Sequence, residues 1–248
     1  MSDAEPIVFD NDRGQRLAGR LHRAGPDGPA AVVCHGMLAD KSSAKHTALA
    51  AGLAAADITA LRFDFAGRGE SAGTLEELTV SGEIADLAAA TGALRAAGYG
   101  PLGLSGSSLG GTVALLAAAR DPEIAAVVTI NSPARLDRLF AEVDRAAWER
   151  TGHLELPAGR LGFGFCTDAA THDLADAARM AGERLFVLQG AADEVVDPAD
   201  AGLLADAALC DLLVIEGADH RLTDERHRVT VLKNTIAFLR RRLAYPGS

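Results

Sequence analysis

Five consecutive residues, Gly106-Ser107-Ser108-Leu109-Gly110, constrain the fold of this chain more than any other segment. A short apolar run, Pro101 to Leu104, precedes them, and an Ala/Leu-rich helical pattern, Gly111 to Arg120, follows them. A strand, a glycine-bracketed serine and a helix form the setting of a nucleophile elbow, the sharp turn that presents a serine hydroxyl at the end of a sheet. Glycines suit both flanking positions, because a Cβ there would crowd the backbone. The motif predicts an acid and a histidine further along the chain.

Asp193 and His220 meet that expectation. Asp193 comes three residues after a predicted buried strand, 185–190, and His220 follows another, 212–215. An open parallel sheet collects its functional residues at the carboxyl ends of its strands. A serine hydroxyl is a poor nucleophile at neutral pH, so His220 would take its proton, and Asp193 would fix the tautomer of the imidazole and stabilise the imidazolium. The sequence therefore predicts Ser108, Asp193 and His220 as catalytic residues.

Three other carboxylates, Glu194, Asp197 and Asp219, compete with Asp193 for the role of the acid. Asp197 precedes a proline and is better used as a helix N-cap. Asp219 adjoins His220 in the chain, which gives it poor geometry for pairing with that ring. Asp193 remains the predicted partner of the histidine.

The segment Cys34-His35-Gly36-Met37 ends a predicted strand, Ala30 to Cys34. An oxyanion hole in this arrangement takes one N–H from the residue after the nucleophile and one from the loop after this strand. We therefore predict the backbone N–H groups of Leu109 and Met37 as its donors. His35 is expected to brace the loop by hydrogen bonding rather than to take part in catalysis.

A second glycine-rich loop, Arg62 to Ser71, has neither the Gly-Lys-Ser/Thr nor the GxGxxG pattern of a phosphate cradle. Its Asp64 and Arg68 are expected to be structural. No His or Cys spacing marks a metal site, and the predicted triad chemistry needs no metal and no organic cofactor. Three histidines are expected at the surface: His22, His46 and His227.

The composition excludes several classes of protein. A formal net charge of −10 argues against nucleic acid or an anionic membrane as the main partner. No stretch approaches the roughly 18 apolar residues of a membrane span. The first residues carry no secretory signal pattern, and the three cysteines have no paired spacing, so a cytoplasmic location is expected. The partner is expected to be a small molecule, and the oligomeric state, monomer or homodimer, stays open.

Strands alternate with helices along most of the chain, a pattern typical of a mostly parallel sheet with helices on both faces. The first two strands, 6–11 and 15–21, read as a hairpin around Asn11-Asp12-Arg13-Gly14. Further predicted strands are 30–34, 58–63, 102–105, 124–130, 185–190 and 212–215, and predicted helices include 45–56, 81–97 and 111–120.

Residues 135–182 interrupt this rhythm. They contain helical patterns over 136–150 and 169–180 around a Gly/Phe-rich patch at 159–165. We interpret part of this segment as a small cap insertion over the site; the alternative is an ordinary crossover helix with a long loop. With 248 residues, the chain is expected to form one domain, 1–248.

The chain resembles the α/β-hydrolase superfamily along nearly its full length. It is most similar to compact carboxylesterases, including cinnamoyl/feruloyl esterase-like proteins and the hydrolase half of hydrolase–OsmC fusions, and also to serine aminopeptidase-like hydrolases. The resemblance implies an α/β-hydrolase fold, Ser108 as nucleophile, Asp193 and His220 as its relay, and Met37 with Leu109 as oxyanion donors. The segments that carry it are 34–37, 62–71, 106–111, 189–196 and 216–220.

Two departures from the family pattern bear on function. Ser107 precedes the nucleophile where many relatives have histidine, and the insertion is short beside the lids of many lipases. A short insertion favours a small, open pocket over one for long-chain lipids. The sequence therefore predicts a serine hydrolase, a carboxylesterase for small or medium acyl or aryl esters. The alternatives are an amidase or peptidase with the same triad and a non-catalytic ligand-binding protein of the same fold.

Overall fold

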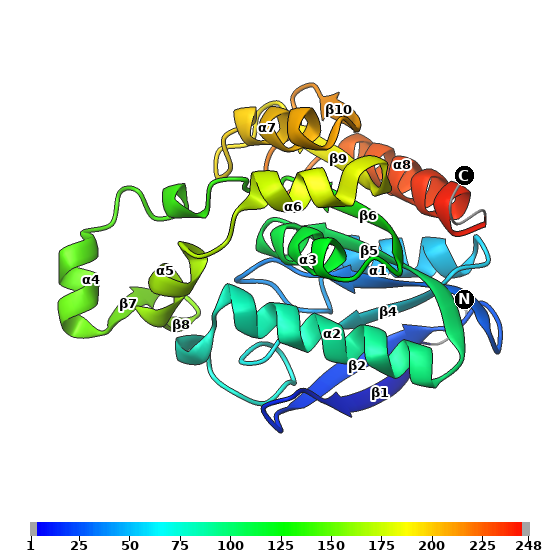
Figure 1. Ribbon diagram of the computed structural model, residues 1–248, viewed down its shortest axis with the longest axis horizontal. Helices are drawn as coiled ribbons and strands as arrows, with labels where there is room; N and C mark the ends of the chain where they lie inside the picture. The colour runs from blue at the N-terminus through cyan, green and yellow to red at the C-terminus, as the bar shows by residue number, and fades with distance from the viewer. Residues whose placement is uncertain (1–3, 245–248) are drawn as a thin grey trace.

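A computed structural model describes residues 4–244 of the chain. Its strands are β1 (Glu5–Asp10), β2 (Arg16–His22), β3 (Gly28–Cys34), β4 (Thr59–Phe63), β5 (Tyr99–Ser107), β6 (Ile124–Ile130), β9 (Leu185–Gly190) and β10 (Asp211–Ile215), with β7 (His153–Leu156) and β8 (Gly159–Gly162) in a separate hairpin. Apart from that hairpin, they form one sheet in the order β1-β2-β4-β3-β5-β6-β9-β10. β2 runs antiparallel to both β1 and β4, and the remaining neighbours are parallel (Figure 1).

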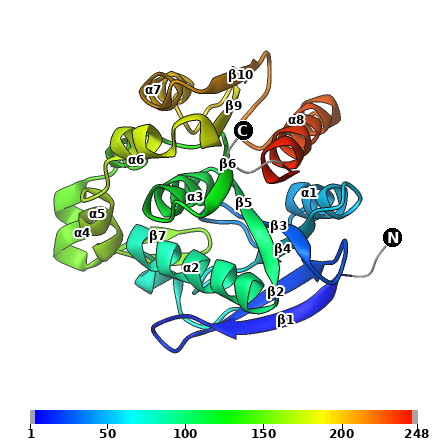
Figure 2. The ribbon, with the colours of Figure 1, turned by 45° about the vertical axis from the view of Figure 1, so that its right-hand side comes forward.

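Helices cover both faces of this sheet (Figure 2). α1 (Ala44–Ala54) and α8 (Glu225–Ala244) pack against one face and touch each other. The other face carries α2 (Val80–Ala96), α3 (Leu109–Arg120), α6 (Leu174–Ala181) and α7 (Ala199–Ala208). The predicted fold class is confirmed: the protein has an α/β-hydrolase fold with a mostly parallel sheet and an N-terminal antiparallel hairpin.

Burial on both faces explains why the central strands are apolar at almost every position. In β3, Ala30, Val32 and Cys34 belong to the core under α2 and α3. Ala31 and Val33 belong to the core under α1 and α8. Because successive side chains of a strand point to opposite faces, one apolar run serves two hydrophobic cores.

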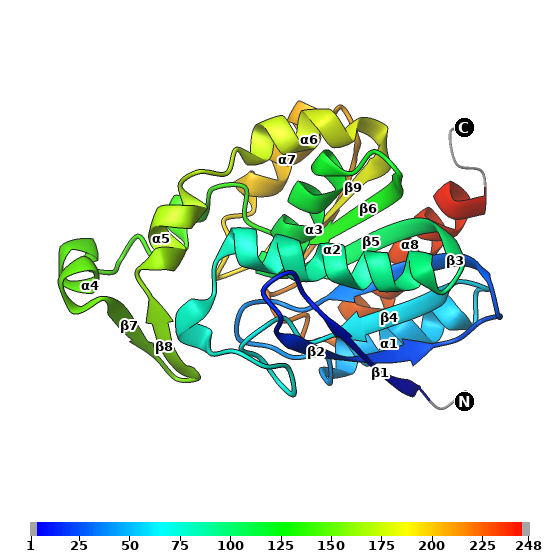
Figure 3. The ribbon, with the colours of Figure 1, turned by 60° about the horizontal axis from the view of Figure 1, so that its bottom comes forward.

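Between β6 and β9 the chain forms a lobe that projects from the sheet and its helices (Figures 1 and 3). Its elements are η2 (Leu136–Arg138), α4 (Arg145–Thr151), the β7–β8 hairpin and α5 (Gly164–Ala169). The helix predicted over 136–150 is wrong, since only a short 3-10 turn and α4 form there. The helix predicted over 169–180 starts later, at Leu174. Asp144 and Asp173 accept N-capping hydrogen bonds and begin α4 and α6 at those points.

Aromatic side chains form the core of this lobe. Trp148 is buried and donates its indole N–H to the carbonyl of Leu161 at 3.1 Å. The ring of Phe140 lies 5.2 Å from that of Trp148 and 5.8 Å from that of Phe165, and Phe163 lies 5.8 Å from Trp148 on another side. These edge-on contacts bury the aromatic rings in a cluster that is continuous with the core under α2 and α3.

The lobe docks on the main body at the first turn of α2 and on η1 (Leu75–Glu77), which contacts β8. The Ser81 N–H donates to the Asp168 carboxylate at 2.9 Å, and Gly162 packs directly against the carbonyl of Glu76. In a parallel sheet, helices begin where the preceding strands end. The lobe therefore lies at the carboxyl edge of the sheet.

Two of the three histidines expected at the surface are buried, so that prediction is wrong for His22 and His46. His22 accepts a hydrogen bond from Arg62 at 2.9 Å, and His46 shares one with Ser43 at 2.8 Å. Burial lowers the pKa of both imidazoles, to about 3 for His46. His227 is half-buried. A lone histidine carries no pattern that reveals such packing.

Within residues 4–244, no helix combines the length and the apolar character that crossing a membrane requires.

Glu83 is an isolated carboxylate in the core under α2. Its side chain is buried, and neither carboxylate oxygen has a hydrogen-bond partner among the described residues. Burial, with a smaller contribution from Asp86, raises the pKa of Glu83 well above its usual value. The folded chain therefore keeps a proton that the unfolded chain releases.

We expect Glu83→Gln to raise the free energy of unfolding at about pH 8 and to leave it almost unchanged at about pH 4. The pKa of Glu83 is higher in the folded chain than in the unfolded chain. The folded state therefore loses stability as the pH rises from the pKa of the unfolded chain toward that of the folded chain. The amide is neutral throughout and escapes this loss. Urea unfolding at both pH values measures the change in the free energy of unfolding. Glu149→Gln, at an exposed position, is the matched control. A gain that is the same at both pH values would contradict the argument.

Candidate active site

Ser108 occupies the turn between β5 and α3. Its backbone has φ 56° and ψ −131°, a conformation that non-glycine residues rarely adopt. The N–H of Ser108 donates to the carbonyl of Ile130 at 2.9 Å, and its own carbonyl accepts from Gly111 at 2.9 Å. A strained residue of this kind persists only where its surroundings determine its position, and such residues cluster at functional sites.

The flanking glycines let three segments meet at this turn. A Cβ on Gly106 would lie 2.2 Å from the carbonyl oxygen of Gly110. A Cβ on Gly110 would lie 2.2 Å from the carbonyl oxygen of His35, in the loop after β3. Both separations are far below van der Waals contact, so β5, α3 and that loop pack this closely only without side chains at these positions.

His35 holds the loop after β3 in place. Its Nδ1 lies 2.9 Å from the carbonyl of Gly36, and its Nε2 lies 3.1 Å from the N–H of Phe65. Because a carbonyl only accepts and an N–H only donates, Nδ1 carries the proton and the ring is neutral. Burial lowers the pKa of His35 in agreement. The ring thus ties the loop to the end of β4, as expected for a bracing residue.

Gly36 lies against Ser108, since a Cβ on Gly36 would lie 3.2 Å from the Ser108 Cβ and 3.7 Å from its Oγ. Met37 follows in the same loop, and Leu109 opens α3. Neither Met37 N–H nor Leu109 N–H donates a hydrogen bond to another residue in the part of the chain that the structure describes. Both N–H groups thus lack a protein partner, one directly after the serine and one directly after Gly36, which contacts the serine.

Asp193 faces His220 across the ends of β9 and β10. Its carboxylate oxygens lie 2.9 and 3.0 Å from Nδ1 of His220. The N–H groups of Val195 and Val196 donate to Oδ1 at 2.9 and 2.8 Å, and Gln189 donates to Oδ2 at 3.2 Å. Burial alone would raise the pKa of Asp193, but hydrogen bonds from His220, Val196 and Val195 hold it below its usual value. The carboxylate is therefore anionic at neutral pH.

The competing acids are engaged elsewhere. Glu194 accepts from the backbone N–H of His220, at 3.2 Å, and not from its ring. The carboxylate of Asp219 binds both the N–H and the hydroxyl of Thr223. Asp197 accepts from Ala199 N–H and pairs with Arg135 at 3.0 Å, but the N-cap of α7 is Pro198, so its expected N-cap role is wrong.

Asn131 is a site residue that the sequence analysis missed. It lies just after β6 with φ 50°, is buried, and donates to the carbonyls of Asp219 at 3.2 Å and His220 at 3.0 Å. Its amide oxygen accepts from Gly190 N–H at 2.8 Å. One side chain thus fixes the loop that carries the histidine to the end of the strand that precedes the acid. The only sequence signal is a polar residue directly after a buried strand.

The structure brings Asp193 and His220 into hydrogen-bond contact, and it places Ser108 at the same edge of the sheet through Ile130 and Asn131. No hydrogen bond joins the Ser108 hydroxyl to the His220 ring within residues 4–244. Over the same residues, no group of three or more His, Cys, Asp or Glu side chains is arranged to hold a metal ion.

Comparison with known proteins identifies a family and several solved structures that resemble this chain. Residues 27–154 match the model of a family described as serine aminopeptidase, S33. This stretch is just over half of the chain. It includes Ser108 and ends before Asp193 and His220. No curated protein sequence matches the chain.

Solved structures resemble the chain over almost its whole length. Est1E from Butyrivibrio proteoclasticus, solved with ferulic acid bound, is 20% identical with a TM-score of 0.80, covering 96% of this chain and 100% of that one. The mouse alpha/beta hydrolase domain-containing protein 10 is 23% identical (TM-score 0.78; 96% and 99%). The esterase domain of a Rhodothermus marinus protein is 26% identical (TM-score 0.74; 96% and 98%). The resemblance to α/β-hydrolases expected from the sequence is confirmed.

We expect Gly106→Ala to lower the free energy of unfolding by about 1–3 kcal/mol, the usual cost of overpacking, because its Cβ would collide with the Gly110 carbonyl. Gly92→Ala is the matched control. Gly92 lies in α2 with open space around its Cα, so alanine there should raise stability by about 0.5–1 kcal/mol. Urea unfolding of both variants measures this. Equal changes in the two would contradict close packing at the turn.

Proposed function

We propose that this chain, which belongs to the serine aminopeptidase S33 family, is a serine hydrolase that cleaves small or medium-sized carboxylic esters. The observation that carries the proposal is the Asp193–His220 pair, held by hydrogen bonds of 2.9 and 3.0 Å at the edge of the sheet where the strained Ser108 turns outward. A carboxylate, an imidazole and a serine in this order along the chain are the components of serine-mediated acyl transfer.

The hydrogen bonds define which nitrogen of His220 acts as the base. A carboxylate only accepts, so Nδ1 carries the proton that points to Asp193, and Nε2 keeps its lone pair. In the proposed first step, Nε2 takes the proton of the Ser108 hydroxyl while Oγ attacks the ester carbonyl. In unliganded hydrolases this contact is often long and tightens when substrate binds. Asp193, anionic and buried, stabilises the imidazolium that forms.

The negative charge that develops on the carbonyl oxygen needs donors that are already in place. Met37 N–H and Leu109 N–H are our candidates, because both lie beside Ser108 without a partner in the described part of the chain. Removing one such donor typically costs about 10²–10³-fold in rate. His220 then protonates the leaving alkoxide, and afterwards activates a water that releases the acid from Ser108.

We propose that the chain is a single domain in which the lobe of residues 136–169 acts as a small cap. The lobe docks at the carboxyl edge of the sheet, where Ser108 lies. The lobe is short, and the rings of Phe140, Trp148, Phe163 and Phe165 in it pack against one another. This supports small or medium substrates, in line with the ferulic acid bound to Est1E.

A second candidate function is hydrolysis of amides or peptides, favoured by the description of the matching family. The same three side chains serve both reactions. An amine is a poorer leaving group than an alkoxide, so amide hydrolysis requires better proton delivery from His220. Rates on a matched ester and amide of the same acyl group decide between the two. Faster turnover of the amide would overturn the ester proposal.

We expect a fluorophosphonate probe to add once to the native chain and not to Ser108→Ala, as read by intact mass. Ser107→Ala is the matched control and should still be labelled, because it leaves the proposed nucleophile in place. On an accepted ester, Ser108→Ala should lower kcat by about 10⁴–10⁶-fold. Asp193→Asn should lower it by about 10⁴-fold through the wrong imidazole tautomer. A folded native chain that takes no label would instead favour a non-catalytic ligand-binding protein.

A further inference from the structure

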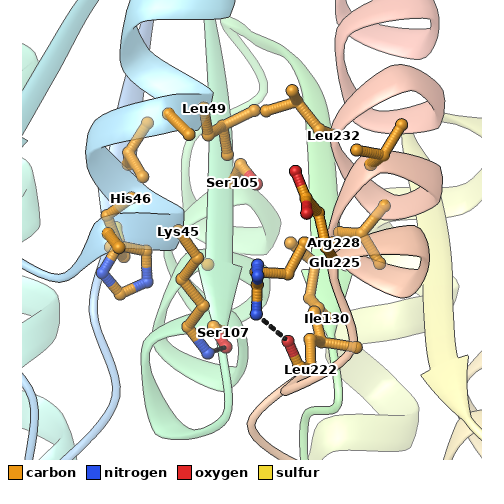
Figure 4. A pocket seen from close by; sticks show the side chains of 17 residues that line it. Lys45, His46, Leu49, Ser105, Ser107, Ile130, Leu222, Glu225, Arg228 and Leu232 are labelled. Atoms are coloured by element: carbon orange, nitrogen blue, oxygen red, sulfur yellow. Dashed lines mark hydrogen bonds between the residues drawn. The ribbon is translucent and has the colours of Figure 1, made fainter. Parts of the chain in front are cut away.

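A cavity of about 260 Å³ lies between α1 and α8, on the sheet face opposite α3 (Figure 4). The carboxyl end of β5 forms its floor through Ser105, Gly106 and Ser107. Successive residues of a strand face opposite sides, so Ser107 points into this cavity while Ser108 turns to the candidate active site. The chemistry proposed above uses none of its side chains.

One end of the cavity is cationic. Lys45 reaches from α1 to the floor, where its Nζ donates to the Ser107 hydroxyl at 2.7 Å. Figure 4 shows the guanidinium of Arg228 reaching the same end from α8; its Nη1 donates to the carbonyls of Leu222 at 3.0 Å and Thr223 at 2.6 Å. Within residues 4–244, no carboxylate lies within 4.0 Å of either cation. Each keeps N–H groups that a ligand can use.

The position of Lys45 in the fold makes its charge unfavourable without a counter-ion. Lys45 stands in the first turn of α1, where the helix dipole favours an anion, and that turn has no acidic residue. Burial lowers the pKa of Lys45, against the smaller opposing influence of Asp193. An anion placed here would gain from both the ammonium and the helix terminus.

The charge of the lining contrasts with the charge of the whole chain. Two cations, Lys45 and Arg228, face the cavity with one carboxylate, Glu225, which is exposed. The chain as a whole carries a net charge of −10. A net positive pocket in so acidic a protein selects against cations.

The other end of the cavity is mostly apolar, with the Ser105 hydroxyl and the Glu225 carboxylate also on the lining (Figure 4). Leu49 and Leu232 face each other across it from α1 and α8, as Figure 4 shows, and Ile130 and Val231 complete its walls. At about 260 Å³ it exceeds the roughly 150 Å³ that holds one benzene and falls below the roughly 300–1,000 Å³ of drug-sized sites. An occupant is therefore about as large as one ring with a short chain.

We propose that this cavity binds a small carboxylic acid, its carboxylate on Lys45 and Arg228 and its apolar body between Leu49 and Leu232. The ligand is a monocarboxylate of the size of 3-phenylpropionate. The site is separate from Ser108, and the acid stays intact there. Its binding does not rest on the proposed hydrolase function.

Isothermal titration calorimetry of the full chain with 3-phenylpropionate tests the proposal. We expect one equivalent to bind, and Lys45→Met to weaken binding by about tenfold or more, since it removes a charged hydrogen-bond donor but keeps an apolar stem. Lys233→Met, an exposed lysine on α8, is the matched control and should bind like the native chain. The neutral 3-phenylpropionamide should bind at least about tenfold more weakly to the native chain for the same reason.

Leu232→Phe provides a second variant that leaves both cations in place. It narrows the apolar end and should also weaken binding, which keeps the test decisive where Lys45→Met does not fold. The proposal is overturned by no binding to the native chain, by equal affinity for acid and amide, or by native affinity in both cavity variants. If the chain binds the acid in this way but takes no fluorophosphonate label, the cavity proposal stands and the proposed hydrolase function is overturned.

Discussion

The close crossing of β5, α3 and the loop after β3 is the constraint on which the rest of the site depends. Gly106, Gly110 and the carbonyl of His35 come together at distances that leave no room for a Cβ. That crossing forces Ser108 to φ 56° and brings Gly36 against its side chain. Leu109 follows the serine directly, and Met37 follows Gly36 in the loop that contacts it. Backbone packing, more than any side-chain contact, therefore gives this edge its geometry.

Buried polar groups whose hydrogen-bond partners are in place also fix the geometry of the site. Asp193 is anionic and excluded from solvent, a state that is stable only because backbone N–H groups and the imidazole of His220 satisfy its oxygens. Asn131 joins the His220 loop to the start of the Asp193 turn. The two loops are thus held to the sheet independently of any substrate. Such preorganised dipoles are the main source of electrostatic stabilisation in enzymes.

The strand that carries the proposed nucleophile ends at two serines that face different sites. Ser108 faces the candidate active site, and Ser107, one residue earlier, binds Lys45 in the cavity behind it. This follows from the two-residue period of a strand combined with a turn that begins directly after it. The carboxyl group of Glu83 lies without a hydrogen-bond partner in the core under α2 and α3. The ammonium of Lys45 lies beside the core under α1 and α8 and keeps N–H groups that no residue accepts. The two groups differ in that only Lys45 borders a space large enough for a ligand.

Local sequence patterns predicted most of the strands of this protein and its candidate catalytic residues. Apolar runs predicted the sheet strands, and the Asn11–Gly14 turn predicted the hairpin, because strand period and turn chemistry are properties of neighbouring residues. The helix predicted over 136–150 was wrong, and the helix predicted over 169–180 began too early, because Asp144 and Asp173 cap the helices that start directly after them. The alternation Gly-x-Ser-x-Gly pointed to Ser108, and the strand ends pointed to Asp193 and His220, but their roles remain predictions.

Contacts between distant segments determined the burial and the side-chain contacts that could not be predicted from the sequence. The burial of His22 and His46, the clamp made by Asn131 and the approach of Lys45 to Ser107 each join residues that no local pattern relates. The sequence by itself determined the order of elements and the elbow, because these rest on periodicity and on the steric freedom of glycine. Only the tertiary structure decided which carboxylate meets His220 and where charge lies without a partner, because both depend on distances set when the strands close into a sheet.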